Sequence, residues 1–201
     1  MKMNFYKYLF IILLSVLSLK SECQTEHING ISLFFPGYLH EIPIFNQLTA
    51  RLQLGIMPQI QQSKNIETGI NGYLSGLASF SFRNYYNHNS RQNRGKNTSL
   101  NSADYVSIMT QYITPPVVFY DNACKCIDFE GDRISRAEEE KEDIMQGLLL
   151  GVNWGIQRNF SQKFSVDLNI GPAYSLKSKD FTFLANLTLL IFLNQNSNNY
   201  W

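Results

Sequence analysis

The chain has 201 residues, of which 44% are hydrophobic and 16% charged, with 17 basic and 16 acidic side chains. This near-neutral balance gives no reason to expect nucleic acid as a partner. The length suits one domain rather than several.

The first 23 residues have the pattern of a secretory signal peptide. Lys2 and Lys7 form a positive region, residues 9–19 are apolar apart from two serines, and Cys23 is a small residue at the expected cleavage site. The apolar run is shorter than the roughly 20 residues that a membrane-spanning helix needs. We therefore predict that residues 1–23 are removed.

Cleavage leaves one domain, residues 24–201, with 14 basic and 15 acidic side chains. A lipoprotein acylated at Cys23 is the alternative, but Glu22 fits poorly where a small residue is expected. After the leader no apolar run approaches about 18 residues, so the sequence offers no transmembrane helix there.

Within the domain, apolar side chains alternate with small or polar ones over segments of about ten residues. Such period-two alternation predicts β-strands whose two faces meet different surroundings. In the clearest segment Val152 and Trp154 share one face, whereas Asn153 lies on the other. In chain order, the predicted strands are about 30–39, 48–57, 72–84, 103–114, 147–157, 163–174 and 181–193.

Two all-β architectures fit these strands, a soluble sandwich and a transmembrane barrel. The strands have about the 9–11 residues that cross a bilayer with tilt, and their polar faces are rich in Gly, Ser, Asn, Gln and Thr, which suits a narrow lumen. Aromatic residues near the strand ends resemble interfacial girdles: Tyr85, Tyr86, Tyr105, Tyr112, Phe160, Tyr174 and Phe181. We predict an antiparallel up-and-down transmembrane β-barrel in the cell outer membrane.

The strand count is incomplete, because seven strands are identified and such barrels usually have an even number, eight being the smallest. The eighth strand is predicted either in residues 24–30, joined to the first segment, or in 116–128. The sequence does not decide between the two.

Two stretches also resemble a known family. The segment 83–105 contains Arg-Asn-Tyr-Tyr-Asn, Gly-Lys-Asn-Thr and Asn-Ser-Ala-Asp-Tyr, and 154–171 begins Trp-Gly-Ile-Gln-Arg-Asn-Phe. They are similar to a porin-like small outer-membrane β-barrel family of Gram-negative bacteria. The matches cover about 83–105 and 147–174, under a third of the chain. The resemblance implies an outer-membrane barrel and carries no known catalytic role.

Barrel topology predicts on which side of the membrane each connection between strands lies. The short turn 158–162 is expected in the periplasm and the long segment 115–145 outside the cell. Segment 85–101, with Arg91, Arg94 and Lys96 and no acidic residue, then falls on the periplasmic side. It is either a surface for phospholipid head groups or periplasmic partners, or a polar connector whose basic side chains reach the membrane interface.

Segment 115–145 carries nine acidic residues between Asp121 and Asp143 and is expected to be a solvated surface loop. Asp128, Glu130 and Asp132 resemble a calcium loop, but Gly131 is misplaced for an EF-hand.

Few residues are candidates for catalysis or metal binding. Cys124 and Cys126 are interpreted as a loop dithiol or a local disulfide, since no further metal ligands accompany them. A lipid hydrolase would need a Ser–His pair, but His27 lies beside the mature N-terminus and we place His40 and His88 in turns. We therefore predict no catalytic residue, cofactor site or metal site.

Three functions remain open. The first is a structural or surface-interaction barrel, with outer-membrane lipids and the barrel-assembly machinery as partners and an external ligand that the sequence does not name. The second is a narrow pore or transport-associated protein, disfavoured because side chains fill an eight-stranded lumen. The third is a lipid-modifying enzyme, disfavoured by the placement of the histidines.

Overall fold

A computed structural model describes residues 25–62, 70–121, 126–127, 133–134 and 144–193 of the chain. The described part is all-β and antiparallel, with two short helical segments. Its strands are β1 (Ile28–Ser32), β2 (Gly37–Phe45), β3 (Leu48–Gln62), β4 (Ile70–Asn84), β5 (Asp104–Ile113), β6 (Val117–Asp121), β7 (Cys126–Ile127), β8 (Arg133–Ile134), β9 (Gly147–Asn159), β10 (Phe164–Ser175) and β11 (Phe181–Phe192).

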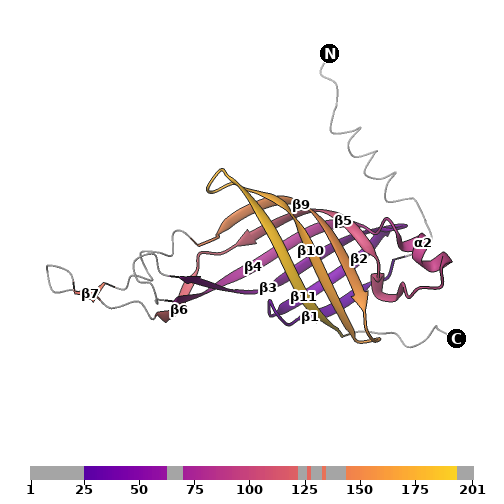
Figure 1. Cartoon of the computed structure of the whole chain (residues 1–201), viewed down its shortest axis with the longest axis horizontal. Helices are drawn as coiled ribbons and strands as arrows, with labels where there is room; N and C mark the ends of the chain where they lie inside the picture. Colours follow the sequence, from indigo (N-terminus) through magenta and orange to yellow (C-terminus); the bar gives the residue numbers. More distant parts are fainter. Residues whose placement is uncertain (1–24, 63–69, 122–125, 128–132, 135–143, 194–201) are drawn as a thin grey trace, which may run out of the picture.

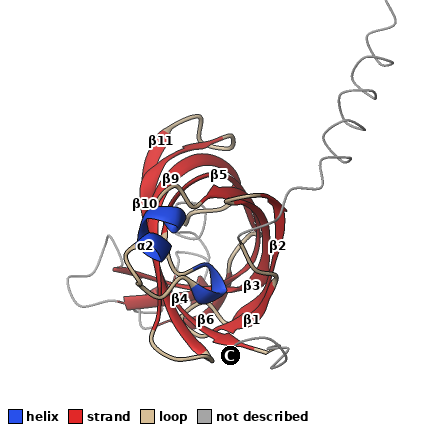
Figure 2. Ribbon diagram, turned by 90° about the vertical axis from the view of Figure 1, so that its right-hand side faces the viewer, coloured by secondary structure: helices blue, strands red, loops and turns tan. Residues whose placement is uncertain are grey.

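Nine of these strands form one sheet whose hydrogen bonding closes on itself. Its order is β3-β2-β1-β11-β10-β9-β5-β4-β6, and β3 also pairs with β4. The strands other than β6 therefore make a ring in which each pairs with its neighbours in sequence, and β11 returns to β1. Figure 2 looks into this ring from the end where helix α2 (His88–Asn93) lies. In Figure 1, β10 and β11 cross in front of β3 and β4 with the opposite slant, as expected for the near and far walls of a closed sheet.

The two faces of the sheet differ in the way that the alternation predicts. On β9, Val152 is 50% exposed and Trp154 41%, whereas Asn153 is 2% exposed and Gln157 is fully buried. On β10, Leu168 points outward between buried neighbours. The outer positions of these strands are thus apolar and the inward positions mostly polar or small, which confirms the facing predicted for 147–157 and 163–174.

The predicted strand at 30–39 is wrong, because these residues form a hairpin. Residues 33–36 turn between β1 and β2, whose register pairs Ser32 with Gly37. Splitting this segment supplies the missing ring strand, close to the first of the two predicted locations. The second location, 116–128, does contain β6, but β6 pairs with the outer part of β4 beside β5.

Part of the predicted loop at 115–145 is therefore sheet. β6 continues the wall next to β4, and β7 pairs with β8 in a separate two-stranded sheet. The residues that resemble a calcium loop lie outside the described residues, as do Cys124 and the predicted signal peptide.

The connections group at two ends of the ring. At one end, the connector 85–103 carries α2 and the short helix η1 (Ser99–Asn101), and Asn159 before the 160–163 turn donates through its main chain to Ser102. This confirms that the connector and the 158–162 turn share an end. We call it the connector end. The opposite end has the turns 33–36 and 176–180 and the projecting ends of β3, β4 and β6. Among the described residues, no helix is long and apolar enough to cross a membrane.

Two of the aromatics predicted at the rims instead point inward. Tyr85 and Tyr105 are fully buried and pack edge to face, with ring centres 5.4 Å apart. Tyr86, Tyr112, Phe160 and Phe181 are exposed, and Tyr174 is partly exposed.

Candidate functional site: charged cluster and cavity inside the ring

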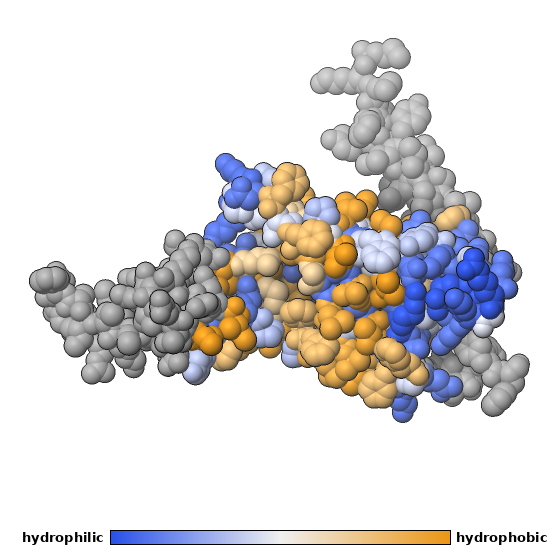
Figure 3. Space-filling model, viewed as in Figure 1, coloured by the Kyte–Doolittle hydropathy of each residue, from blue (hydrophilic) through white to orange (hydrophobic). Residues whose placement is uncertain are grey.

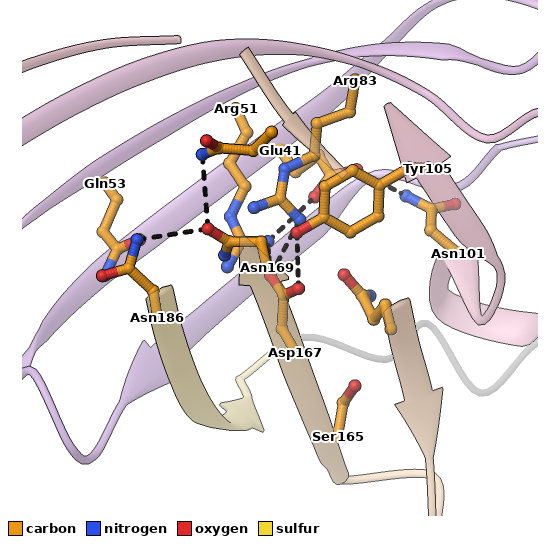
Figure 4. Close-up of polar contacts among 12 residues, drawn as sticks. Glu41, Arg51, Gln53, Arg83, Asn101, Tyr105, Ser165, Asp167, Asn169 and Asn186 are labelled. Carbon is orange, nitrogen blue, oxygen red and sulfur yellow. Dashed lines mark hydrogen bonds and ion pairs between the residues drawn. The ribbon is translucent and has the colours of Figure 1, made fainter. Parts of the chain in front are cut away.

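A cluster of charged side chains lies inside the ring, centred on Asp167 of β10. Arg51 Nη1 of β3 and Arg83 Nη1 of β4 lie 2.6 and 2.8 Å from Asp167 Oδ2, and Tyr105 of β5 donates its hydroxyl to Oδ1 at 2.6 Å. Figure 4 shows the three side chains converging on the carboxylate from separate strands. Successive side chains of a strand point to opposite faces of the sheet, and each of these residues occupies an inward position. Their side chains therefore meet inside the ring.

These charges are removed from water. The Asp167 side chain is 1% exposed, and those of Arg51 and Arg83 are 3% and 7% exposed. A buried ion is stable only when it is paired and its remaining hydrogen-bonding atoms are satisfied. The Arg83 guanidinium also lies 4.2 Å from the centre of the Tyr105 ring, where a cation interacts favourably with the aromatic face.

Glu41 of β2 completes the cluster and balances its charge. Its Oε2 lies 3.9 Å from Arg51 Nη1. Its Oε1 accepts hydrogen bonds from the Tyr85 hydroxyl at 2.8 Å and from Asn101 Nδ2 at 3.0 Å. The four charges therefore sum to zero, and the cluster links β2, β3, β4, β5 and β10 with the connector. We call Glu41, Arg51, Arg83, Tyr105 and Asp167 the charged cluster.

The connector closes its end of the ring by inserting two residues. Leu100 packs with Ile28 and Leu39, and Asn101 exchanges hydrogen bonds with the main chain of Glu26. Leu100 and Asn101 have φ values of 49° and 57°. A non-glycine residue in the left-handed region costs on the order of 1–3 kcal/mol and persists where surrounding contacts fix it. The contacts around Leu100 and Asn101 therefore hold the connector in this conformation.

His88, at the start of α2, is also buried in the connector. Burial disfavours its charged form and lowers its pKa. The nearby Arg91 acts in the same direction, while a hydrogen bond with the Thr98 main chain partly opposes the shift. Arg91 is engaged within the connector, donating to the carbonyl oxygens of Ser102 and Asn97. Arg94 and Lys96 are exposed.

A cavity of about 50 Å³ lies beside the charged cluster. It has space for a few water molecules, which is far below the roughly 300–1,000 Å³ of a small-molecule site. Arg51 Nε, Arg83 Nε and Asn153 Oδ1 are buried without a hydrogen-bond partner, and Arg51, Arg83 and Asn153 line the cavity. Its remaining walls are mixed: Phe35, Gln53, Met57, Leu77, Ser79, Ser81, Ser107, Met109, Gln111, Asp167, Asn169, Asn186 and Thr188.

Apolar side chains close the ring on the far side of the cavity. Met57, Leu77, Met109, Leu149 and Leu184 form a buried cluster there. Further members of this layer are Ile113 and Ala173, with Phe35 packed against it. The cavity thus lies between an apolar layer and the plugged connector end.

The histidines do not gather with a nucleophile. His40 belongs to β2 rather than to a turn, a correction to the predicted placement. It faces outward, with Nδ1 2.6 Å from Asn29 Oδ1 and its ring 4.8 Å from that of His27. His88 is in α2, within the connector. Among the described residues there is no group of three or more His, Cys, Asp or Glu placed to hold a metal ion.

Sequence reasoning found part of the cluster. The alternation in the predicted strands 48–57 and 163–174 places Arg51 and Asp167 on the polar faces, and Arg83 lies in the segment that resembles the porin-like family. Glu41 was missed because the first strand was taken to end near residue 39. The charge of each residue could have indicated the cluster. An ionisable residue on the inward side of a narrow closed sheet requires a partner of opposite charge.

In comparisons with known proteins, no family model, no curated protein and no solved structure matches the chain. The resemblance to a porin-like family stays a prediction.

Proposed function

We propose that the chain is an integral outer-membrane β-barrel of eight strands with a structural or surface-interaction role and no catalytic activity. The observation that carries the proposal is the reversed polarity of the ring. Charged residues such as Arg51 and Asp167 are buried inside, while Leu52, Ile108 and Val152 are exposed outside at 41, 66 and 50%. A soluble protein would have to leave this apolar belt in water, whereas lipid would cover it.

The exposed surface supports an orientation across a bilayer. Figure 3 shows apolar side chains gathered across the middle of the visible face and hydrophilic ones over α2 at the connector end. β9, β10 and β11 have 13, 12 and 12 residues, enough to cross about 25 Å of hydrocarbon with tilt. We assign the connector end to the periplasm and the end with β6 to the cell exterior.

The external end supports a surface-interaction role. There the sheet of β3, β4 and β6 projects past β5, and several of its side chains are unusually exposed for apolar residues. Ile60 is 77% exposed, Val117 66% and Phe119 56%. Exposed apolar groups at a polar rim are typical of protein-contact surfaces.

A pore is the second candidate, and the interior argues against it. The connector residues Leu100 and Asn101 plug one end, the cavity between the layers is about 50 Å³, and Met57 and Leu149 belong to the apolar layer beyond it. A lipid-modifying enzyme is the third candidate; His27 and His40 face outward beside Asn29 and Tyr38 rather than beside a serine. Phospholipid turnover by the purified protein would establish that activity.

The proposal is tested by refolding the purified 24–201 domain into detergent and into phospholipid vesicles. We expect insertion into vesicles, a heat-modifiable shift on a detergent gel, and no single-channel conductance in planar bilayers. Steady ion conductance would favour the pore. A monomer that is folded and soluble without detergent would overturn the membrane assignment altogether.

A further inference from the structure

The wall of the ring has a gap beside β11. β1 pairs with β11 only through Gly30–Ser32, opposite Leu190–Phe192. β2 pairs with β3 only as far as Gly55. In the part of the chain that the structure describes, the remaining length of β11, residues 181–188, has a strand partner on its β10 side only.

The register identifies the main-chain groups that face the gap. The Leu189 carbonyl accepts from the Leu33 N–H at 2.9 Å, and the Leu193 N–H donates to the Asn29 carbonyl at 2.8 Å, whereas the Phe192 N–H bonds toward β10 at Lys163. The N–H and C=O of one strand residue point to the same side, and the side alternates along the strand. The main-chain groups of Phe183, Ala185 and Leu187 therefore face the gap.

The exposed side chains at this edge are apolar. Phe181 and Phe183 are 81% and 67% exposed. Behind them Phe35 packs against the buried cluster that contains Met57 and Leu184. Phe35, which also lines the cavity, thus lies between the gap and the interior of the ring.

The two edges that border the gap are not equivalent. On β3 the Ile56 N–H bonds to the Pro36 carbonyl on the β2 side, so residue 58 also faces the gap, and it is proline. Proline has no N–H and protects an edge against strand addition. β11 has no proline and no charged residue from Phe181 to Phe192. Of the two edges that border the gap in the described residues, the β11 edge is therefore the better suited to receive a strand.

We infer that the free edge of β11, from Phe181 to Leu187, is a docking site for an extended, alternately apolar strand of another polypeptide, which pairs with it through main-chain hydrogen bonds. A lipid acyl chain could cover the phenylalanines, but it has no donors or acceptors for the main chain. Unpaired main-chain groups are not left facing hydrocarbon. The partner must therefore supply alternating N–H and C=O groups.

A second copy of this chain is a poor occupant. The two-fold axis that relates two paired β11 strands is perpendicular to the sheet for an antiparallel pair and runs along the strands for a parallel pair. Barrel strands are tilted by about 35–45° from the membrane normal, so the two copies could not share one orientation in a bilayer. This step and the exclusion of a lipid chain rest on the proposed membrane location, whereas the open edge itself does not.

Amide hydrogen exchange tests the edge directly. The purified protein is studied by NMR in micelles, or in buffer should it prove soluble, with the probe peptide Lys-Thr-Val-Thr-Val-Thr-Val-Lys. We expect the amides of Phe183, Ala185 and Leu187 to exchange rapidly without peptide and at least tenfold more slowly at millimolar peptide. Those of Asn186 and Thr188, bonded toward β10, should be slow in both states. A fully N-methylated peptide is the control and should give no protection.

Matched variants separate strand pairing from side-chain contact. Ala185→Pro removes an N–H that the wall does not use and should abolish the protection at Phe183, whereas Ala185→Val keeps the N–H and should retain it. Leu187→Pro serves if Ala185→Pro loses heat-modifiable mobility. Slow exchange without peptide, or no slowing at millimolar peptide, overturns the inference. Peptide protection that survives proline substitution also overturns it. None of these outcomes alters the fractionation or vesicle insertion that tests the proposed function.

Discussion

Replacing Asp167 by asparagine tests how strongly the charged cluster holds the ring together. Asparagine keeps the shape and can still accept a hydrogen bond from Tyr105, but it removes the charge opposite two guanidinium groups. Glu41 remains 3.9 Å from Arg51, so Arg83 loses its closest counter-ion. Breaking a buried ion pair in this way costs about 3–5 kcal/mol of unfolding free energy.

Two further variants show whether the loss comes from buried charge. Asp104→Asn breaks an ion pair with Arg158 whose side chains are 19% and 33% exposed, and it should cost no more than about 1 kcal/mol. Arg83→Met in the Asp167→Asn background removes the uncompensated cation, and the pair should show a coupling of about 1–3 kcal/mol.

The assay is urea unfolding of vesicle-inserted protein, followed by tryptophan fluorescence and by the fraction of heat-modifiable form. The buried ion pairs would not stabilise the ring if the unfolding free energy of Asp167→Asn lay within about 1 kcal/mol of the wild-type value. The same would follow if Asp167→Asn lost no more unfolding free energy than Asp104→Asn. The cluster would then be hydrated and its ion pairs unimportant for stability.

Four other changes test the outer belt, the packing inside the ring, segment 122–143 and the connector. Val152→Arg puts a charge on the outer belt and should lower vesicle folding stability by about 2–4 kcal/mol, against about 0–1 for Phe160→Arg near the rim; equal effects would mean that the belt does not meet hydrocarbon. Gly155→Ala places a Cβ in steric conflict with the buried ring of Tyr105, so the melting temperature should fall, and an unchanged value would contradict that packing. Deleting 122–143 and joining the ends with a short glycine-containing turn should leave folding yield nearly unchanged, because loop-closure cost varies only with the logarithm of length; failure to assemble would show that the segment is part of the wall. Because His88 has a lowered pKa, it resists protonation when folded, so its stabilising contribution is present above about pH 6.5 and lost as the pH falls. His88→Gln should flatten this acid dependence of unfolding, and an unchanged profile would exclude His88 as its source.

Period-two alternation predicted most of the wall because it records the contrast between the two faces of each strand. It worked on β9 and β10, where apolar and polar residues alternate without interruption. It failed at residues 30–39, where Phe34 and Phe35 lie in a tight turn but continue the apolar pattern. The alternation signal does not separate a continuous strand from two short ones joined by apolar turn residues.

The interior required contacts that no single strand contains. Glu41, Arg83 and Asp167 come from three strands and meet only when the ring is closed. Tyr85 and Tyr105 were taken for rim aromatics because position near a strand end does not reveal facing. Their burial follows from the connector, which seals the ring over them. The free edge of β11 likewise depends on the short pairing of β1, which the sequence alone does not predict.

We propose that lipid covers the apolar belt of the ring, and membrane fractionation of the cells that produce the protein tests this most directly. Envelopes are separated on a sucrose density gradient, extracted with carbonate, and probed for the chain with and without heating. The account predicts recovery in the outer-membrane fraction, resistance to extraction, and a gel mobility that changes on boiling. Recovery in the soluble periplasmic fraction, with one mobility before and after boiling, would contradict it.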